Sequence, residues 1–246
     1  MDETYICYQL TKLMRFTENP IMFDVGAHDG ASFARFLSDG WRVVAFEPNP
    51  FKYPPIEKLS QKSNLLTLCK KAVSDKEEKG LTFYLSDISD GISSLCNFHN
   101  SHKEATFKVD SIRLDTYCKN FKIDRINFLK IDTEGYDYFV LKSLDWSTIT
   151  PEIIECEFEN NKTREKLNYT WEDMAEFLSN KGYKILISEW YPIVQYGTTH
   201  KWKCFKEYGG GAGSTDVAED AWGNFIAVRD QNIYDILINS FKDKIS

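Results

Sequence analysis

The sequence predicts an α/β fold: a doubly wound, largely parallel sheet with helices on both faces and a small β-hairpin insertion. Strand and helix patterns alternate along the 246 residues, and 42% hydrophobic with 27% charged residues is typical of a globular chain. No internal repeat and no linker rich in Pro, Gly or Ser divides it. We therefore expect an N-terminal helical extension over 1–19 and a single domain over 20–246.

The first part of the chain alternates apolar runs with helical patterns. Phe33, Phe36 and Leu37 recur at helical spacing, and Gly40 follows them where a helix-terminating glycine belongs. Prolines at 54 and 55 suit the first turn of a second helix. The predicted order is a strand at 21–27, a helix at 29–40, a strand at 41–50, a helix at 54–59 and a strand at 64–73.

Short extended pieces at 79–87, 92–95 and 105–114 then interrupt the alternation and predict the hairpin-like insertion. Thr170-x-x-Asp173 resembles a capping box at the start of a later helix. The stretch 189–223 has no clear periodicity, contains a glycine run at 209–213, and is expected to be an acceptor-binding or lid loop. The remaining predicted elements are helices at 115–121, 135–144 and 170–183 and strands at 125–132, 151–158, 184–188 and 224–229.

Composition restricts the class of protein. The net charge of −7 and the pI of about 5.2 disfavour nucleic acid as a partner. No stretch approaches a membrane span, and the first residues lack the pattern of a secretory signal. The six cysteines are spread out with no C-x-x-C pair. We therefore expect a reduced, cytoplasmic protein without structural zinc, and leave a homodimer open.

The turn "DVGAHDG" follows the first strand and predicts a backbone cradle for a ligand. A dinucleotide site needs G-x-G-x-x-G, but here His28 and Ala31 replace the second and third glycines. A pyrophosphate would have to pass backbone that carries an imidazole. The zwitterionic methionine end of S-adenosylmethionine (SAM) suits the spacing of Gly26 and Gly30 better. An ordinary strand-to-helix turn is the alternative.

Glu47 ends the second strand, 23 residues after Asp24. A carboxylate about 20 residues beyond a glycine turn can accept both hydroxyls of a ribose. The pair indicates an adenosine-containing cofactor, whereas a solvated acid at a strand end is the alternative. A P-loop nucleotidase is excluded because G-x-x-x-x-G-K-[ST] does not occur.

The fourth strand ends in "KIDTEG", where polar residues stand on or beside an otherwise apolar strand. Ligands of open α/β sheets bind at the carboxyl ends of the strands, so Asp132 and Glu134 are expected at the reacting end of the cofactor. Either acid can hold a substrate hydroxyl or take its proton. The alternative is that Asp132 or Thr133 caps the following helix.

Further candidates lie on later segments. Glu155, Glu157 and Glu159 alternate along the fifth strand and share one face, which is either solvated or part of the site. With the two acids of "KIDTEG" they would suit a carboxylate metal site, but no metal is predicted. His28 and His200 are the other candidates for proton transfer, and His200 lies in the long loop among aromatic residues.

Several of these motifs together resemble the FkbM-type methyltransferases, a branch of the class I SAM-dependent methyltransferases. The resemblance runs from about residue 20 to about 182, and its most specific part is K-I-D-x-E-G. It implies a Rossmann-like, seven-stranded sheet with the last strand antiparallel, and methyl transfer to a hydroxyl oxygen, commonly on glycan sugars or polyketide-type products. The motifs are "FDVGAHDG", "VVAFEPNP", "KKAVSDKEEKGLTFYLSD", "ISSL", "KIDTEG" and "PEIIECEFEN".

The resemblance also implies site residues. The family often has Asn where this chain has His28, so His28 is expected to add a hydrogen bond or a pH dependence. The stretch 183–223 follows no family pattern and is where acceptor specificity is expected. The implied active-site residues are Asp132 and Glu134, whereas His200 is a third candidate base because of its place in the long loop. The resemblance assigns Asp24, Gly26, His28, Gly30, Glu47, Ala72 and Val73 to the SAM site, and the full set of SAM-binding residues that we predict adds Ala27, Asp29, Pro48 and Asp132.

The sequence thus predicts a SAM-dependent O-methyltransferase that forms S-adenosylhomocysteine (SAH) as product. The acceptor would be a small molecule or a glycan, most of all a sugar in surface polysaccharide or a nucleotide-linked sugar. Lys201, Lys203 and Lys206 could neutralise an anionic acceptor. An NAD(P)-dependent oxidoreductase is the alternative, although no convincing Tyr-x-x-x-Lys pair occurs. A catalytically silent SAM-binding or partner-binding protein is another, and a nucleic-acid methyltransferase is disfavoured.

Overall fold

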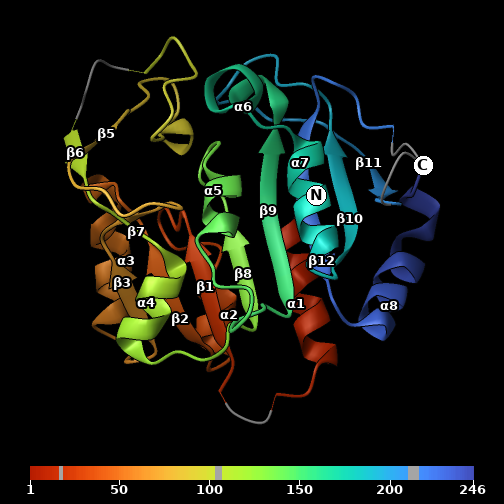
Figure 1. Cartoon of the computed structure of the whole chain (residues 1–246), viewed down its shortest axis with the longest axis horizontal. Helices are drawn as coiled ribbons and strands as arrows, with labels where there is room; N and C mark the ends of the chain where they lie inside the picture. The colour runs from red at the N-terminus through yellow and green to blue at the C-terminus, as the bar shows by residue number, and fades with distance from the viewer. Residues whose placement is uncertain (17–18, 103–106, 210–215) are drawn as a thin grey trace. The chain divides into compact units, whose positions relative to one another are not determined.

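A computed structural model describes residues 1–16, 19–102, 107–209 and 216–246 of the chain. Contacts divide the chain into two compact units. Unit 1 consists of Met1–Arg15 and Glu152–Ser246, and unit 2 of Phe16–Pro151. The elements of both units are labelled in Figure 1. Within the described ranges, no helix is long and apolar enough to cross a membrane.

Unit 2 contains four parallel strands in the order β8-β1-β2-β3, drawn side by side in Figure 1. Phe23 on β1 lies opposite Val44 on one side and Leu129 on the other. Every residue of β1 and β8 is buried, as expected for parallel strands covered on both faces. The strands are β1 (Ile21–Val25), β2 (Arg42–Phe46), β3 (Leu66–Cys69) and β8 (Phe128–Ile131).

Aromatic side chains fill the core of unit 2. The fully buried ring of Phe36 on α2 contacts Trp41 and Phe128 with centroids 5.1 Å away in each case. The ring centroids of Phe46 on β2 and Phe23 on β1 lie 5.4 Å apart, so side chains of neighbouring strands pack against each other. These rings pack the parallel strands against one another and against α2. The helices of unit 2 are α2 (Ala34–Ser38), η1 (Pro50–Lys52), α3 (Tyr53–Ser60), η2 (Asp90–Ile92), α4 (Leu114–Phe121) and α5 (Asp137–Lys142).

The insertion of unit 2 differs from the predicted hairpin. Strands β5 (Leu81–Phe83) and β6 (Phe107–Val109) do pair antiparallel, but residues 84–106 connect them, so a simple hairpin is not confirmed. The strand predicted over 64–73 is also wrong in part. It ends at Cys69, and Ala72–Val73 forms a separate strand, β4, parallel to β7 (Ser111–Ile112). Residues 105 and 106 of the predicted extended piece lie outside the described ranges.

Unit 1 contains four strands in the order β11-β10-β12-β9, and each neighbouring pair is antiparallel. The last strand, β12, therefore runs against both of its neighbours, as predicted. Ile226 of β12, for example, lies between Leu186 and Glu155. The strands are β9 (Ile153–Glu159), β10 (Lys184–Trp190), β11 (Trp202–Glu207) and β12 (Trp222–Val228).

Strand β11 corrects two predictions. It occupies part of the stretch expected to be a loop at 189–223. Among the described residues, the main-sheet strands number eight, four in each unit, instead of the seven predicted. The cause is a buried acid: Glu189 on β10 has no exposed surface, and Lys203 and Lys206 of β11 lie 2.8 and 3.2 Å from it. Such cross-strand pairing leaves no periodic signal. Residues 210–213 of the glycine run lie outside the described ranges.

The helices of unit 1 include two that the sequence pattern did not predict. Helix α6 is polar along its length, which hides it from a search for an apolar stripe, and α8 lies beyond the last predicted strand. Helix α7 begins with the predicted capping box, in which Thr170 is the N-cap and Asp173 is the third residue of the helix. The helices are α1 (Glu3–Leu13), α6 (Asn160–Leu167), α7 (Trp171–Asn180), α8 (Gln231–Phe241) and η3 (Lys242–Lys244). The division at residue 20 stays a prediction.

Candidate functional site

A cavity of about 240 Å³ lies in unit 2 at the carboxyl ends of β1, β2 and β8. This is where open α/β sheets bind their ligands. Four separate segments of the sequence contribute the predicted residues that line it. Those residues are Gly26, His28, Glu47, Pro48, Ala72, Val73, Asp132 and Glu134.

The glycine turn brings β1 close to the end of β8. Gly26 has φ +85°, and a Cβ there would lie 1.8 Å from the backbone oxygen of Asp132, so no other residue fits. Gly30, at φ +89°, serves packing instead, since its Cβ would meet the ring of Phe33 at 2.6 Å. The cavity is lined by Gly26 and His28 of this turn, while the predicted residues Ala27, Asp29 and Gly30 lie outside its lining.

Glu47 is held by backbone donors on both carboxylate oxygens. The amide N–H of His28 donates to Oε2 and that of Asn49 to Oε1, each over 2.8 Å. His28 has a left-handed backbone with φ +50°, which few non-glycine residues adopt. Burial of Glu47 raises its pKa from 4.5 to about 7, against the opposing effect of the two amides. Each oxygen keeps accepting capacity for a ligand hydroxyl.

The predicted site residue Asp24 is not among the residues that line the cavity. Its carboxylate is fully buried and accepts a short hydrogen bond from the Ser32 hydroxyl, and burial raises its pKa. The Lys130 ammonium lies 3.7 Å from Asp24 Oδ1 and 3.2 Å from Asp132 Oδ2. Lys130 thus joins an acid of β1 to an acid that lines the cavity, and its positive charge partly offsets the effect of burial on the Asp24 pKa.

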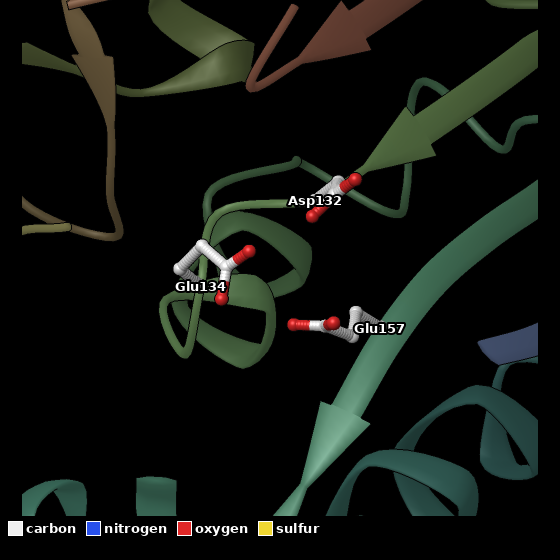
Figure 2. A group of neighbouring side chains, drawn as sticks. All are labelled: Asp132, Glu134 and Glu157. Carbon is white, nitrogen blue, oxygen red and sulfur yellow. The ribbon is translucent and has the colours of Figure 1, made fainter. Parts of the chain in front are cut away.

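Asp132 and Glu134 lie on the turn that leaves β8, and Figure 2 shows Asp132 at the tip of the strand and Glu134 on the loop beside α5. Glu134 has φ +55° and Gly135 φ +104°, so two successive residues are left-handed. The Thr133 hydroxyl donates to Asp137 over 2.8 Å. Helix α5 has no side-chain hydrogen bond at its N-cap. Capping therefore does not explain Asp132.

Sequence reasoning missed the part of the wall that the insertion supplies. Phe83, Ser93 and Leu95 line the cavity, although nothing in their spacing relates them to the strand ends. Tyr136 also lines it, and burial raises its pKa. The sequence places Tyr136 only in an apolar helical stripe. Lys52 and Lys71 add positive charge to the lining, without a motif that marks them.

The remaining candidates belong to unit 1. The His200 ring packs edge-on against Trp222, with centroids 5.3 Å apart. Glu157, labelled on β9 in Figure 2, and Glu159 are both buried, and the buried Lys162 ammonium lies 3.1 and 2.9 Å from them. Glu155 accepts a hydrogen bond from Thr4 over 2.8 Å. The alternating acids of β9 are therefore buried rather than solvated.

Comparison with known proteins gives one family match. The profile described as "Methyltransferase FkbM domain" matches residues 24–185. No curated protein matches significantly. The solved structures similar in fold include a precorrin-6y C5,15-methyltransferase from Geobacter metallireducens GS-15 (13% identity, 91% of this chain and 87% of that chain, TM-score 0.43). Another is magnesium protoporphyrin IX methyltransferase from Synechocystis PCC 6803, with bound SAM (10% identity, 93% of this chain and 78% of that chain, TM-score 0.42).

The matched segment contains the whole glycine turn, Glu47, and the turn with Asp132 and Glu134. Eight of the predicted site residues within it line one cavity. SAM is the cofactor consistent with this family match. Because the match extends over well more than half of the sequence, the chain belongs to the FkbM family of methyltransferases.

Proposed function

We propose that the protein is a SAM-dependent O-methyltransferase that acts on a hydroxyl of a small molecule or glycan, most of all a sugar. The observation that carries this proposal is the shared cavity. One part of its wall, Glu47 with Ala72 and Val73, suits an adenosine, and another part presents Asp132 and Glu134. A carboxylate placed beside a hydroxyl can act as the general base in methyl transfer to that oxygen.

The residues present fit SAM. Backbone fills the space where a side chain at Gly26 would stand, so the turn can approach a ligand closely. Glu47 would accept the ribose hydroxyls, and the small apolar side chains of Ala72 and Val73 would lie beside the adenine. When bound, SAM supplies an electrophilic methyl group on a positively charged sulfur and leaves as SAH.

We assign Glu134 as the base and Asp132 as the residue that orients the acceptor and balances positive charge. Lys130 engages one oxygen of Asp132 at 3.2 Å, which ties that carboxylate to the protein. Glu134 lines the same cavity and would take the proton of the hydroxyl as its oxygen attacks the methyl carbon. A placed base contributes roughly 10²–10⁴-fold, and alignment with exclusion of water supplies much of the remaining acceleration.

The test is methyl transfer from SAM with a deuterated methyl group to a panel of free sugars, nucleotide sugars and glycan oligosaccharides. Once an acceptor is found, Glu134→Gln should lower turnover roughly 10²–10⁴-fold. Asp132→Asn should raise the KM for the acceptor. Both variants should bind SAH within a few-fold of the unchanged protein. Unchanged turnover in both would remove these acids from the mechanism.

A second measurement addresses the acceptor in cells. Surface glycan from cells with and without the protein should differ by the mass of one methylene group on a single sugar. Linkage analysis then identifies the hydroxyl. Methylated product on a protein or nucleic acid, with glycan unchanged, would contradict a sugar acceptor.

We also infer that the protein works in a reducing compartment, the cytoplasm. The support is its cysteines: all six are free thiols, and four of them are buried. Labelling by a thiol reagent in the unfolded protein should therefore count six free thiols without prior reduction.

A further inference from the structure

The hydroxyl of Ser94 links the insertion to the turn that carries Glu134. Ser94 is 1% exposed, and its Oγ donates to the backbone oxygen of Glu134 over 2.9 Å, with the oxygen of Thr133 at 3.4 Å. The amide N–H of Cys96 donates to the same Oγ over 3.0 Å. The single hydroxyl thus both donates and accepts, and it spans two segments about forty residues apart in the sequence.

The backbone of Ser94 is itself fixed. It exchanges two hydrogen bonds with Tyr84, of 2.8 and 3.0 Å, which form an antiparallel bridge within the insertion. The residues on either side, Ser93 and Leu95, line the cavity. A shift of Ser94 would therefore move this part of the wall and the Glu134 turn together.

The turn that Ser94 holds has an unfavourable backbone. Glu134 is left-handed at φ +55°, where a residue with a Cβ is disfavoured, and Gly135 follows at φ +104°. Such a conformation persists only where surrounding contacts determine it. The hydrogen bond from Ser94 to the carbonyl of Glu134 is a contact of that kind. The hydrogen bonds from Thr133 to Asp137 secure the other side of the turn.

We propose that Ser94 is a positioning residue that locks the Glu134 turn in its left-handed form and clamps the insertion wall against it. The clamp keeps the carboxylate of Glu134 and the side chains of Ser93 and Leu95 in one arrangement around the acceptor. Its catalytic consequence rests on the proposed function. The clamp itself does not, so the two can be tested separately.

Amide hydrogen exchange of the full chain tests the clamp. Ser94→Ala should speed exchange in peptides covering residues 132–138 by roughly five- to tenfold, the loss expected for one buried hydrogen bond. The matched control is Ser86→Ala in the same insertion. The Ser86 hydroxyl bonds Ser101 and the amides of Ile88 and Ser89, so its loss should leave residues 132–138 unchanged.

Two further variants separate locking from general loss of structure. Ser94→Thr keeps the hydroxyl and should restore slow exchange. In a Glu134→Gly background, the left-handed conformation costs nothing, so Ser94→Ala should have a much smaller effect on residues 132–138. An equal effect in both backgrounds, or exchange that changes only within residues 84–102, would overturn the proposal.

Calorimetry with SAH distinguishes this proposal from the proposed function. Ser94→Ala should bind SAH within about threefold of the unchanged protein. The hydrogen bonds of the clamp hold the Glu134 turn, whereas Glu47 is held by the amides of His28 and Asn49. With an acceptor in hand, turnover should fall while the KM for SAM stays constant. If the unchanged protein fails to bind SAH, the proposed function fails, and the exchange result still decides the clamp.

Discussion

At the scale of single residues, the cavity depends on groups placed against their ordinary preference. Glu47 is a carboxylate with 5% exposure, and His28 and Glu134 hold left-handed backbones without being glycine. Both left-handed residues line the cavity. Strained backbones and buried titratable groups cluster at binding and catalytic sites, where they serve function at a cost in stability. They therefore yield sharp tests.

The raised pKa of Glu47 predicts pH-dependent binding of SAH. Ribose hydroxyls donate to the ionised carboxylate, and Glu47 takes up a proton as the pH falls through about 7. Calorimetry from pH 8.5 to 5.5 should show that the affinity for SAH stays unchanged above about pH 7. Below that pH, the affinity should fall by up to tenfold per pH unit. Glu47→Gln should bind weakly at every pH, with a flat profile. Constant affinity in the unchanged protein would contradict the ribose role.

The same pKa shift has the opposite sign for the stability of the ligand-free protein. Because the folded pKa lies above the ordinary 4.5, the protonated acid favours the folded state. This contribution is fully present below about 4.5 and is lost as the pH rises through about 7. Urea unfolding of the unchanged protein and of Glu47→Gln should therefore converge at low pH, and the substituted protein should become relatively more stable at high pH.

We predict that replacing Gly26 by alanine is enough to abolish SAH binding. Gly26→Ala places a Cβ 1.8 Å from the backbone oxygen of Asp132 and imposes φ +85° on an alanine. The ends of β1 and β8 must separate, so SAH binding should be abolished and the melting temperature lowered. The matched control is Gly40→Ala, also at positive φ but with open space around its Cβ. It should destabilise modestly and still bind SAH.

At the scale of elements, buried charges join segments that no apolar pattern connects. Helix α1 is fastened to β10 by Glu3, a buried acid that accepts from the Ser188 hydroxyl and, over 2.8 Å, from the Trp190 ring. Strand β11 is fastened to the same strand through Glu189 and its two lysines. Hydrogen bonds and ion pairs of this kind specify partners, whereas apolar burial provides most of the stabilisation.

Helix α1 provides an element-scale test. Glu3→Ala leaves the buried Ser188 hydroxyl and the half-buried Trp190 ring N–H without their acceptor, and it should cost about 1–3 kcal/mol of unfolding free energy. Glu3→Gln keeps an acceptor oxygen and should cost less. Urea denaturation measures both. Equal losses would show that the negative charge itself, rather than the accepting oxygen, carries the contribution.

At the scale of the whole molecule, binding of the cofactor product SAH should raise the free energy of unfolding, because the ligand binds only the folded protein. A ligand at a hundredfold excess over its Kd adds about 2.7 kcal/mol, which for a chain of this length is a rise of roughly 5–10 °C in melting temperature. SAH should produce this rise and NADH should not. Stabilisation by NADH without any by SAH would favour an oxidoreductase over the methyltransferase assignment.

The predicted residues that line the cavity are ones that local constraints mark in the sequence. Gly26 must be glycine because the backbone of Asp132 passes close to it, and Glu47 follows after one helix and one strand. Tertiary partners were less visible. The sequence shows Lys130 only as a polar residue on a strand. The structure shows that its ammonium lies near the carboxylates of both Asp24 and Asp132.

The sequence by itself determined the alternation of strands and helices, the glycine turn, and the acids at the strand ends, because short-range sterics and apolar periodicity fix all three. Only the tertiary structure decided that Ala72–Val73 leaves the third strand, that β11 exists, and that Ser94 bonds to the Glu134 turn. Each of these depends on a partner far away in the chain. A hydrogen bond or a buried ion pair has no periodicity, so it becomes visible only when the chain has folded.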